Sequence, residues 1–145
     1  MTAALRWQWC RLHELGVEQL YALLAAREAV FVVEQNCAYQ ELDGRDGAAL
    51  HLIAWSGDVV AACLRVLDPP ALGRVMTAKN FRGCGLGREL MRRALQHLDA
   101  SGTAEVRISA QTYLEKFYRS FGFEPVSEPY LEDGIPHIGM VRRTP

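Results

Sequence analysis

Three glycines lie within five residues in the segment Arg82–Gly87. Glycine has no Cβ, so the backbone can turn sharply there or approach a ligand closely. Residues 88–99 carry apolar side chains at helical spacing, which predicts that the glycines lie at the first turn of a helix. The unpaired N–H groups and the positive dipole end of a helix attract anions, and Arg82 and Arg88 add charge. The segment therefore predicts a phosphate-binding loop.

The spacing of the glycines distinguishes between phosphate-binding patterns. The Walker pattern needs a Lys after its last glycine, and Arg88 stands there instead. The dinucleotide pattern G-x-G-x-x-G, begun at Gly83, would need its third glycine at the position of Arg88. What remains is Arg-x-x-Gly-x-Gly, formed by Arg82, Gly85 and Gly87. Because glycine clusters also form ordinary strand-to-helix turns, the loop alone leaves its ligand open.

Bulk composition limits the class of protein. With 145 residues, 50% hydrophobic and 23% charged, the chain is expected to form one globular domain over 1–145 that needs no disulfide or metal. A net charge of −1 without a basic block gives little support for nucleic-acid binding. The sequence shows neither a leader nor an apolar run of about 18 residues, so no membrane segment is expected. The four cysteines lack metal-ligand spacing, so a cytoplasmic protein is expected.

Hydrophobic periodicity and turn residues predict the order of elements. Strands are expected at 5–12, 50–55, 59–67, 73–77, 105–110 and 137–142 with one more before residue 134, and helices at 17–30 (running on toward 33), 88–99 and 113–121. Residues 34–48 are expected to form a loop or a short irregular helix. This order predicts the α/β (α+β) class, with one mixed sheet of six or seven strands and helices on both faces.

Three motifs occur in a characteristic order. They are Val75-Met76-Thr77 before the glycine loop, Arg82-x-x-Gly85-x-Gly87, and Phe117-Tyr118 before Phe121-Gly122-Phe123. Together they resemble the GNAT superfamily of N-acetyltransferases, whose sheet is mostly antiparallel. The segments 31–35, 42–44 and 132–137 resemble the ElaA-type branch of that superfamily, so the resemblance spans nearly the whole chain.

The resemblance implies acetyl-CoA or a related acyl-CoA as donor, a small amine as acceptor, and no metal. The loop would hold the pyrophosphate through main-chain N–H groups, and the strand 75–77 would pair with the pantetheine arm. A splayed strand would leave an amide free to polarise the thioester carbonyl. Gln111 stands where many relatives carry an Asn. The donor-binding residues implied are Val75, Met76, Thr77, Arg82, Gly83, Cys84, Gly85, Leu86, Gly87, Arg88 and Gln111.

Tyr118 matches the tyrosine that protonates the departing CoA thiolate in such enzymes. Tyrosine has an ordinary pKa of about 10, so it is protonated at neutral pH and can donate. The alternative is a core aromatic residue on a short helix beside Phe117 and Phe121.

The general base is less clearly marked. Val106 stands where some relatives carry a carboxylate, and strand alternation points the neighbouring Glu105 to the other face. Candidates on the acceptor side are Glu34, Asp43, His51, Glu132 and His137, and a water relay is an equal alternative. Acids in 34–48 and 128–136 favour a cationic amine acceptor. A homodimer is possible, and an acyl-CoA-binding sensor without catalysis is the competing interpretation.

Overall fold

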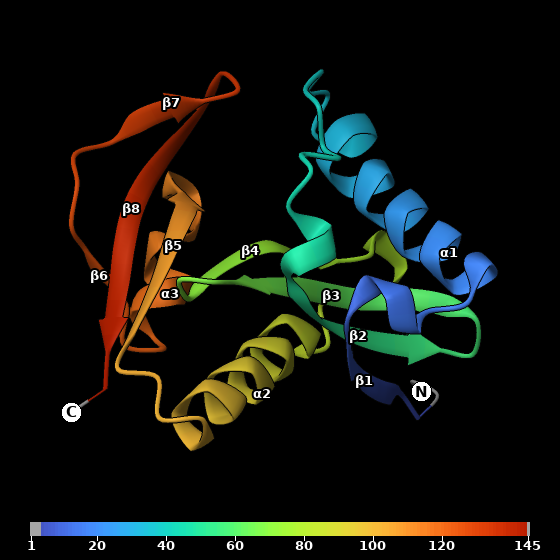
Figure 1. The fold of residues 1–145 in the computed structure, drawn as a ribbon. Coiled ribbons are helices and arrows are strands. Elements are labelled where there is room, and N and C mark those ends of the chain that lie inside the picture. Colours follow the sequence, from blue (N-terminus) through green and yellow to red (C-terminus); the bar gives the residue numbers. More distant parts are fainter. Residues whose placement is uncertain (1–3, 145) are drawn as a thin grey trace.

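A computed structural model describes residues 4–144, which fold around one eight-stranded sheet (Figure 1). The strands are β1 (Arg6–Cys10), β2 (Leu50–Ser56), β3 (Val59–Leu67), β4 (Ala71–Thr77), β5 (Glu105–Gln111), β6 (Glu124–Pro125), β7 (Tyr130–Glu132) and β8 (Ile135–Arg143). Their order is β1-β2-β3-β4-β5-β8-β6, and β7 pairs with β8. Among the strands of residues 4–144, only the β4–β5 pair is parallel. The mixed, mostly antiparallel sheet is confirmed.

The sheet has eight strands where six or seven were predicted, and the difference lies in the short strands next to β8. β6 has two residues and β7 has three, so neither is long enough to show an alternating pattern. Both are defined by their pairing with β8. The β7–β8 connection is a two-residue turn in which Asp133 and Gly134 both have positive φ, as in a type I′ hairpin.

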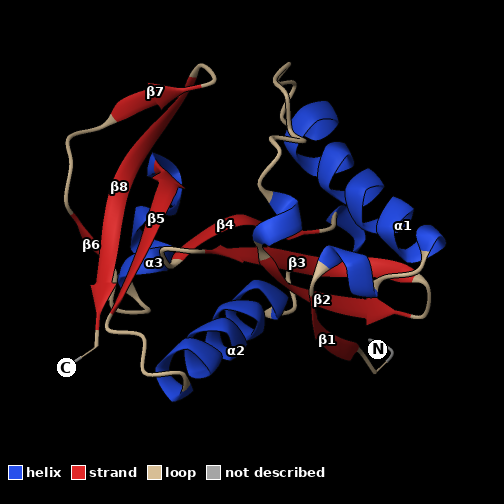
Figure 2. Cartoon of the chain, in the orientation of Figure 1, coloured by secondary structure: helices blue, strands red, loops and turns tan. Residues whose placement is uncertain are grey.

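Helices cover both faces of the sheet, as expected (Figure 2). The longer ones are α1 (Val17–Glu28), followed by a π-helix (Ala29–Glu34), then α2 (Leu86–Ala100) and α3 (Glu115–Arg119). Single 3-10 turns lie at Leu12–Glu14, Asp46–Ala48, Lys79–Phe81 and Thr112–Leu114. The expected aromatic helix at 113–121 is therefore a 3-10 turn followed by α3. Among residues 4–144, no helix has the length and apolarity needed to cross a membrane.

Two hydrophobic clusters lie on opposite faces of the sheet. Leu90, Met91 and Leu98 of α2 pack in one cluster with Leu52 of β2. Ile53, the next residue of β2, packs in the other cluster beneath α1. Consecutive strand residues point to opposite faces, so both sides of β2 are covered by helices. This explains why β2 and β3 are buried along most of their length.

The sheet opens between β4 and β5. Their parallel pairing is limited to Ala71 with Arg107 and Leu72 with Ile108, and beyond these pairs the strands diverge (Figure 1). A β-bulge on β4 accompanies the divergence, and within it Arg74 has a φ of 49°. The opening separates β1–β4 from β5–β8 and is the feature that positions the candidate site.

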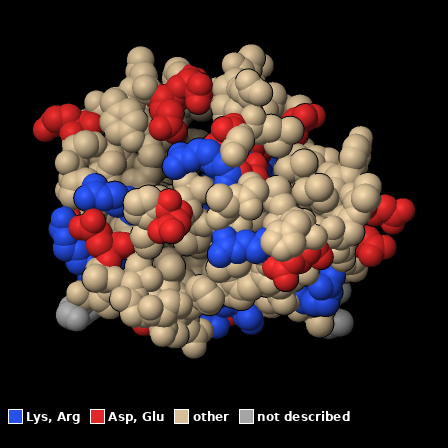
Figure 3. Space-filling model, in the orientation of Figure 1, with Lys and Arg blue, Asp and Glu red and all other residues tan. Residues whose placement is uncertain are grey.

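Charges of both signs are interspersed on the face shown in Figure 3. No group of His, Cys, Asp and Glu side chains within residues 4–144 has an arrangement suited to a metal ion. All four cysteines are free thiols.

Candidate active site

The glycine loop lies at the start of α2, as predicted. Gly83 and Gly85 each have a φ of 82°, which other residues adopt only with strain, and Gly85 is the N-cap of the helix. The first helical hydrogen bond runs from the Glu89 N–H to the Gly85 carbonyl at 3.1 Å. Within the described residues, no protein acceptor bonds the N–H groups of residues 83–88. These main-chain donors lie at the positive end of the helix dipole, which suits an anion.

The side chains of the two flanking arginines are already held by protein groups. Arg82 donates from Nε to the Thr77 carbonyl at 3.0 Å and forms an ion pair with Glu34 at 2.6 Å. Arg88 donates to Ser120 Oγ at 3.3 Å, and its guanidinium lies over the rings of Phe117 and Phe121. The free capacity for an anion is therefore in the main chain. Glu34, a candidate for the acceptor side, lies instead beside the glycine loop.

Two adjacent cavities follow the opening between β4 and β5. We call the smaller, of about 330 Å³, the glycine-loop cavity, and its wall contains Thr77, Arg82 and Gly87. We call the larger, of about 590 Å³, the hairpin cavity, because residues of the β7–β8 hairpin line it. Residues common to both walls are Phe31, Gln35, Val75, Gln111, Leu114 and Tyr118. The two cavities therefore meet at β4, at the end of β5 and at Tyr118.

The predicted donor-binding residues divide between cavity wall and loop surface. Those that line the glycine-loop cavity are Val75, Met76, Thr77, Arg82, Gly87 and Gln111. Those that line neither cavity are Gly83, Cys84, Gly85, Leu86 and Arg88. β4 pairs with β3 through Met76 and Thr77. Within the part of the chain that is described, its other edge has no partner strand beyond Leu72 and is open to a ligand backbone.

Tyr118 lies where the cavities meet and is 5% exposed. Its ring packs edge-to-face against Phe117 and Phe123, so it belongs to the core as well as to the cavity wall. Burial, with a smaller contribution from Tyr113, raises the pKa of Tyr118 above its ordinary value. The phenol therefore keeps its proton throughout the neutral range, so at the start of a reaction it can donate a proton but cannot act as a base.

Gln111 ends β5 and reaches across the opening. Its Nε2 atom donates to Oε1 of Gln35 at 3.4 Å, which connects β5 to the residue that follows the π-helix. Gln35 was not predicted as a wall residue, although it ends the segment 31–35, one of those that resemble the ElaA-type branch. π-Helical turns are frequent at functional sites, and this one contributes Phe31 to both cavities.

Two of the acceptor-side candidates, Asp43 and His51, are bound by other groups of the protein. Asp43 lines the hairpin cavity, but Arg65 binds it at 2.6 and 2.9 Å and lowers its pKa well below the usual range. His51 lines neither cavity and is 2% exposed. Its Nε2 atom bonds the Asp46 carbonyl at 3.0 Å, and burial lowers its pKa. Neither residue is placed to take a proton from a substrate.

Arginines neutralise the acids in 34–48 that favoured a cationic acceptor. Arg27 binds Glu41 at 2.5 Å and Asp46 at 2.7 Å. Arg65 binds Asp43 and Asp46, and Arg74 binds Glu41 and Asp43. We call this set of three arginines and three carboxylates the ionic network. Because the charges cancel within it, these acids no longer argue for a cationic acceptor.

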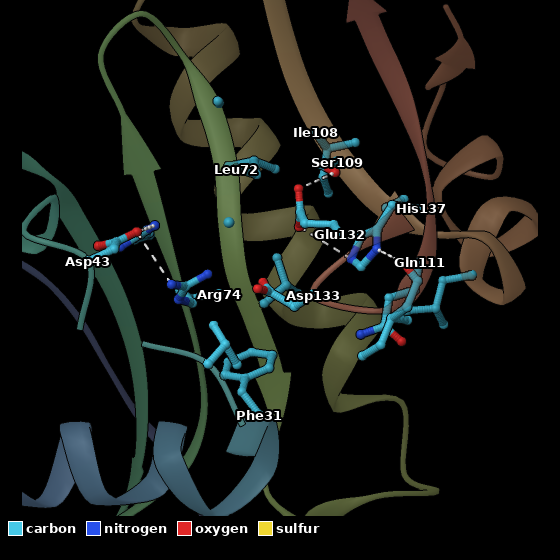
Figure 4. Close-up of a pocket in the computed structure, with 18 of the residues that line it drawn as sticks. Phe31, Asp43, Leu72, Arg74, Ile108, Ser109, Gln111, Glu132, Asp133 and His137 are labelled. Atoms are coloured by element: carbon cyan, nitrogen blue, oxygen red, sulfur yellow. Dashed lines mark hydrogen bonds and ion pairs between the residues drawn. The ribbon is translucent and has the colours of Figure 1, made fainter. Parts of the chain in front are cut away.

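Glu132 and His137 remain at the wall of the hairpin cavity, together with Asp133 (Figure 4). His137 Nε2 lies 3.4 Å from Oε2 of Glu132. Val106 is buried and Glu105 pairs with Arg107 and Arg143 at the surface, so β5 offers no carboxylate to the cavity from these two positions.

The GNAT acetyltransferase domain matches residues 14–144. The chain belongs to the GNAT family. Protein ElaA of Escherichia coli is 47% identical over a 146-residue alignment that covers 93% of this chain and 95% of that protein. This GNAT protein is therefore also a relative of ElaA.

Solved structures of GNAT proteins share its fold. An acyl-CoA N-acyltransferase from Pseudomonas aeruginosa has a TM-score of 0.90 and 46% sequence identity, with 96% of this chain and 99% of that chain covered. E. coli ElaA has a TM-score of 0.89 and 44% identity, with 97% of this chain and all of that chain (100%) covered.

Proposed function

We propose that this GNAT protein is an acyl-CoA-dependent N-acyltransferase, with acetyl-CoA as donor and a primary amine as acceptor. The observation that carries the proposal is the junction of the two cavities at Tyr118. A donor in the glycine-loop cavity would place its acyl group there, and an acceptor in the hairpin cavity would reach the same point. The Pseudomonas aeruginosa acyl-CoA N-acyltransferase, at 46% identity, supports the reaction class.

Donor binding would use main-chain groups. The N–H groups of residues 83–88 would hold the diphosphate of acetyl-CoA, and the free edge of β4 would pair with the pantetheine arm. Both contacts use backbone, so they depend on the left-handed glycines and on the divergence of β4 from β5. No step in this binding calls for a metal ion.

The reaction would proceed by direct transfer. The amine nitrogen attacks the thioester carbonyl, the C–N bond forms, and an amide N–H on the bulged part of β4 stabilises the oxyanion. The C–S bond then breaks, and the CoA thiolate takes the proton of Tyr118. The amine loses one proton to a base, which returns it to solvent, and Tyr118 is reprotonated. The products are an amide and free CoA thiol.

A sensor that binds acyl-CoA without catalysis is the second candidate, because Val106 leaves β5 without the carboxylate that serves as base in some relatives. The test is release of CoA thiol from acetyl-CoA across a panel of amino acids, polyamines, amino sugars and peptides, with thermal shift by acetyl-CoA measured in parallel. Transfer to at least one amine is expected. Thermal stabilisation without thiol release would support the sensor, and absence of both would contradict donor binding itself.

The cellular compartment belongs to the same proposal. Cys10, Cys37, Cys63 and Cys84 are free thiols, which suits a reducing environment such as the cytoplasm.

A further inference from the structure

A histidine and a glutamate face each other at the wall of the hairpin cavity. His137 lies on β8 directly opposite Gln111, the residue at which β5 ends. Glu132 ends β7, and its Oε2 atom lies 3.4 Å from His137 Nε2. Figure 4 shows Glu132 between Ser109 and His137. The pair thus lies beside Gln111, where the two cavities meet.

The hydrogen bonds of His137 fix which ring nitrogen is free. Its Nδ1 atom lies 2.7 Å from the carbonyl oxygen of Ile135. A carbonyl only accepts, so Nδ1 must carry a proton, and in the neutral ring Nε2 holds the lone pair. The ring is 8% exposed and stacks on Tyr130, which holds its orientation. Nε2 is therefore a fixed proton acceptor on the Glu132 side of the ring.

Two acceptors then face one another with no proton between them. Ser109 Oγ donates to Oε1 of Glu132 at 3.3 Å, while Oε2 is directed at His137 Nε2. A neutral imidazole nitrogen and a carboxylate repel each other unless a donor lies between them or the ring becomes charged. An ammonium group has three N–H donors and a positive charge, so it satisfies both acceptors at once.

We propose that His137 and Glu132 bind the acceptor as its ammonium form and that His137 is the general base. This inference rests on the proposed function. A proton moves from the ammonium nitrogen to Nε2 and on to solvent, and the amine lone pair that is freed attacks the thioester. After the C–N bond forms, nitrogen loses its second proton to Nε2, while Tyr118 supplies the proton of the departing thiol. Glu132 stabilises the imidazolium that forms. Its side chain is 48% exposed, which gives the proton a route from His137 to solvent.

The other charged or titratable groups around His137 do not compete for this role. Tyr130 on β7 bonds Ser109 through its hydroxyl. Across the cavity, Asp43 and Arg74 form an ion pair with each other. Asp133, in the turn, is bound at its carbonyl by the Cys37 thiol at 3.4 Å, and its carboxylate is a second anion that favours a cationic acceptor. The wall on this side therefore suits a primary ammonium ion.

The test compares His137→Gln, Glu132→Gln and the control His13→Gln, an exposed histidine on the 3-10 turn before α1. Kinetics use the amine that wild-type protein acetylates fastest in the panel, from pH 6 to pH 9. His137→Gln is expected to lower kcat/KM for the amine about 100-fold at pH 7. The deficit should shrink toward pH 9, because the amine then deprotonates without help. Glu132→Gln should raise KM for the amine, because one of the two acceptors for the ammonium group loses its negative charge.

Acetyl-CoA should stabilise all four proteins equally against heat, which separates loss of the base from loss of the fold. A kcat/KM for His137→Gln that equals wild type, or a deficit that stays constant from pH 6 to pH 9, would overturn the assignment of the base and leave the proposed function standing. If wild-type protein transfers acetyl to no amine, the proposed function is overturned and the assignment with it.

Discussion

The two ends of the opening between β4 and β5 are built from different chemistry. The glycine-loop end presents main-chain N–H groups of residues 83–88 and the bare edge of β4. The hairpin end presents side chains, and the ionic network behind it joins the loop at 41–46 to α1, β3 and β4. Backbone contacts need only a particular conformation, whereas side-chain contacts need particular partners. We therefore expect substitutions at the two ends to have different effects, on stability at the hairpin end and on donor affinity at the glycine-loop end.

The largest loss of stability is expected from Arg27→Ala at the hairpin end. Arg27 is 1% exposed and binds both Glu41 and Asp46, so its removal takes from two buried carboxylates their shortest ion pair and leaves each with a single arginine. The free energy of unfolding should fall by about 3–5 kcal/mol. Guanidinium unfolding measures it, with Arg92→Ala as control, since Arg92 pairs with Glu89 at the exposed surface of α2. Equal losses in the two variants would contradict a structural role for the network.

Gly85→Glu should abolish donor binding at the other end. The substitution forces a residue with a side chain into a φ of 82° and places a carboxylate among the N–H groups that would hold the diphosphate. Affinity for acetyl-CoA should fall at least about 100-fold, or about 2.7 kcal/mol, by calorimetry. Gly57→Glu is the matched control, because Gly57 has a φ of 61° in the β2–β3 turn. A similar loss in both variants would point to strain rather than to the loop.

Tyr118→Phe tests the place where the two ends meet. Donor affinity should stay the same while kcat falls about 10- to 100-fold, because only the phenol proton is removed. Burial raises the pKa of Tyr118, so the wild-type rate should not decline between pH 7 and pH 9 through loss of that proton. Tyr21→Phe, on the exposed face of α1, is the control. Unchanged kcat in Tyr118→Phe would remove Tyr118 from the acid role.

The smallest effect is expected from Arg82→Ala. Its guanidinium is bound by Glu34 and the Thr77 carbonyl, so the main chain would still hold most of the donor. Affinity for acetyl-CoA should fall less than tenfold, that is by less than about 1.4 kcal/mol. A loss as large as that of Gly85→Glu would mean that the side chain, and not the backbone, holds the diphosphate.

The contrast between the two ends also explains what the sequence could reveal. α2 was predicted well because Leu90, Met91 and Leu98 repeat at a local helical period, and the glycine loop precedes it directly. Both signals lie within one short segment. β5, whose residues alternate, and the apolar strands β2 and β3 were also placed correctly, whereas β6 and β7 are too short to carry a period.

The hairpin end was harder to predict because its contacts are distant in the sequence. Arg27 lies within the helix predicted at 17–30, yet its partners lie 14 and 19 residues further along the chain. The carboxylates of 41–46 appeared free for the same reason. His51 was a candidate for the acceptor side, but the fold places its ring against the Asp46 carbonyl, away from both cavities. Side-chain pairing of this kind follows from the fold and has no local pattern.

We propose that main-chain N–H groups at residues 83–88 hold the diphosphate of the donor. Amide chemical shifts of ¹⁵N-labelled protein, followed while acetyl-CoA is added, test it directly. The largest shifts are expected at residues 83–88, and they should persist when Arg82 is replaced by alanine. Saturation by acetyl-CoA with those amides unmoved would contradict it.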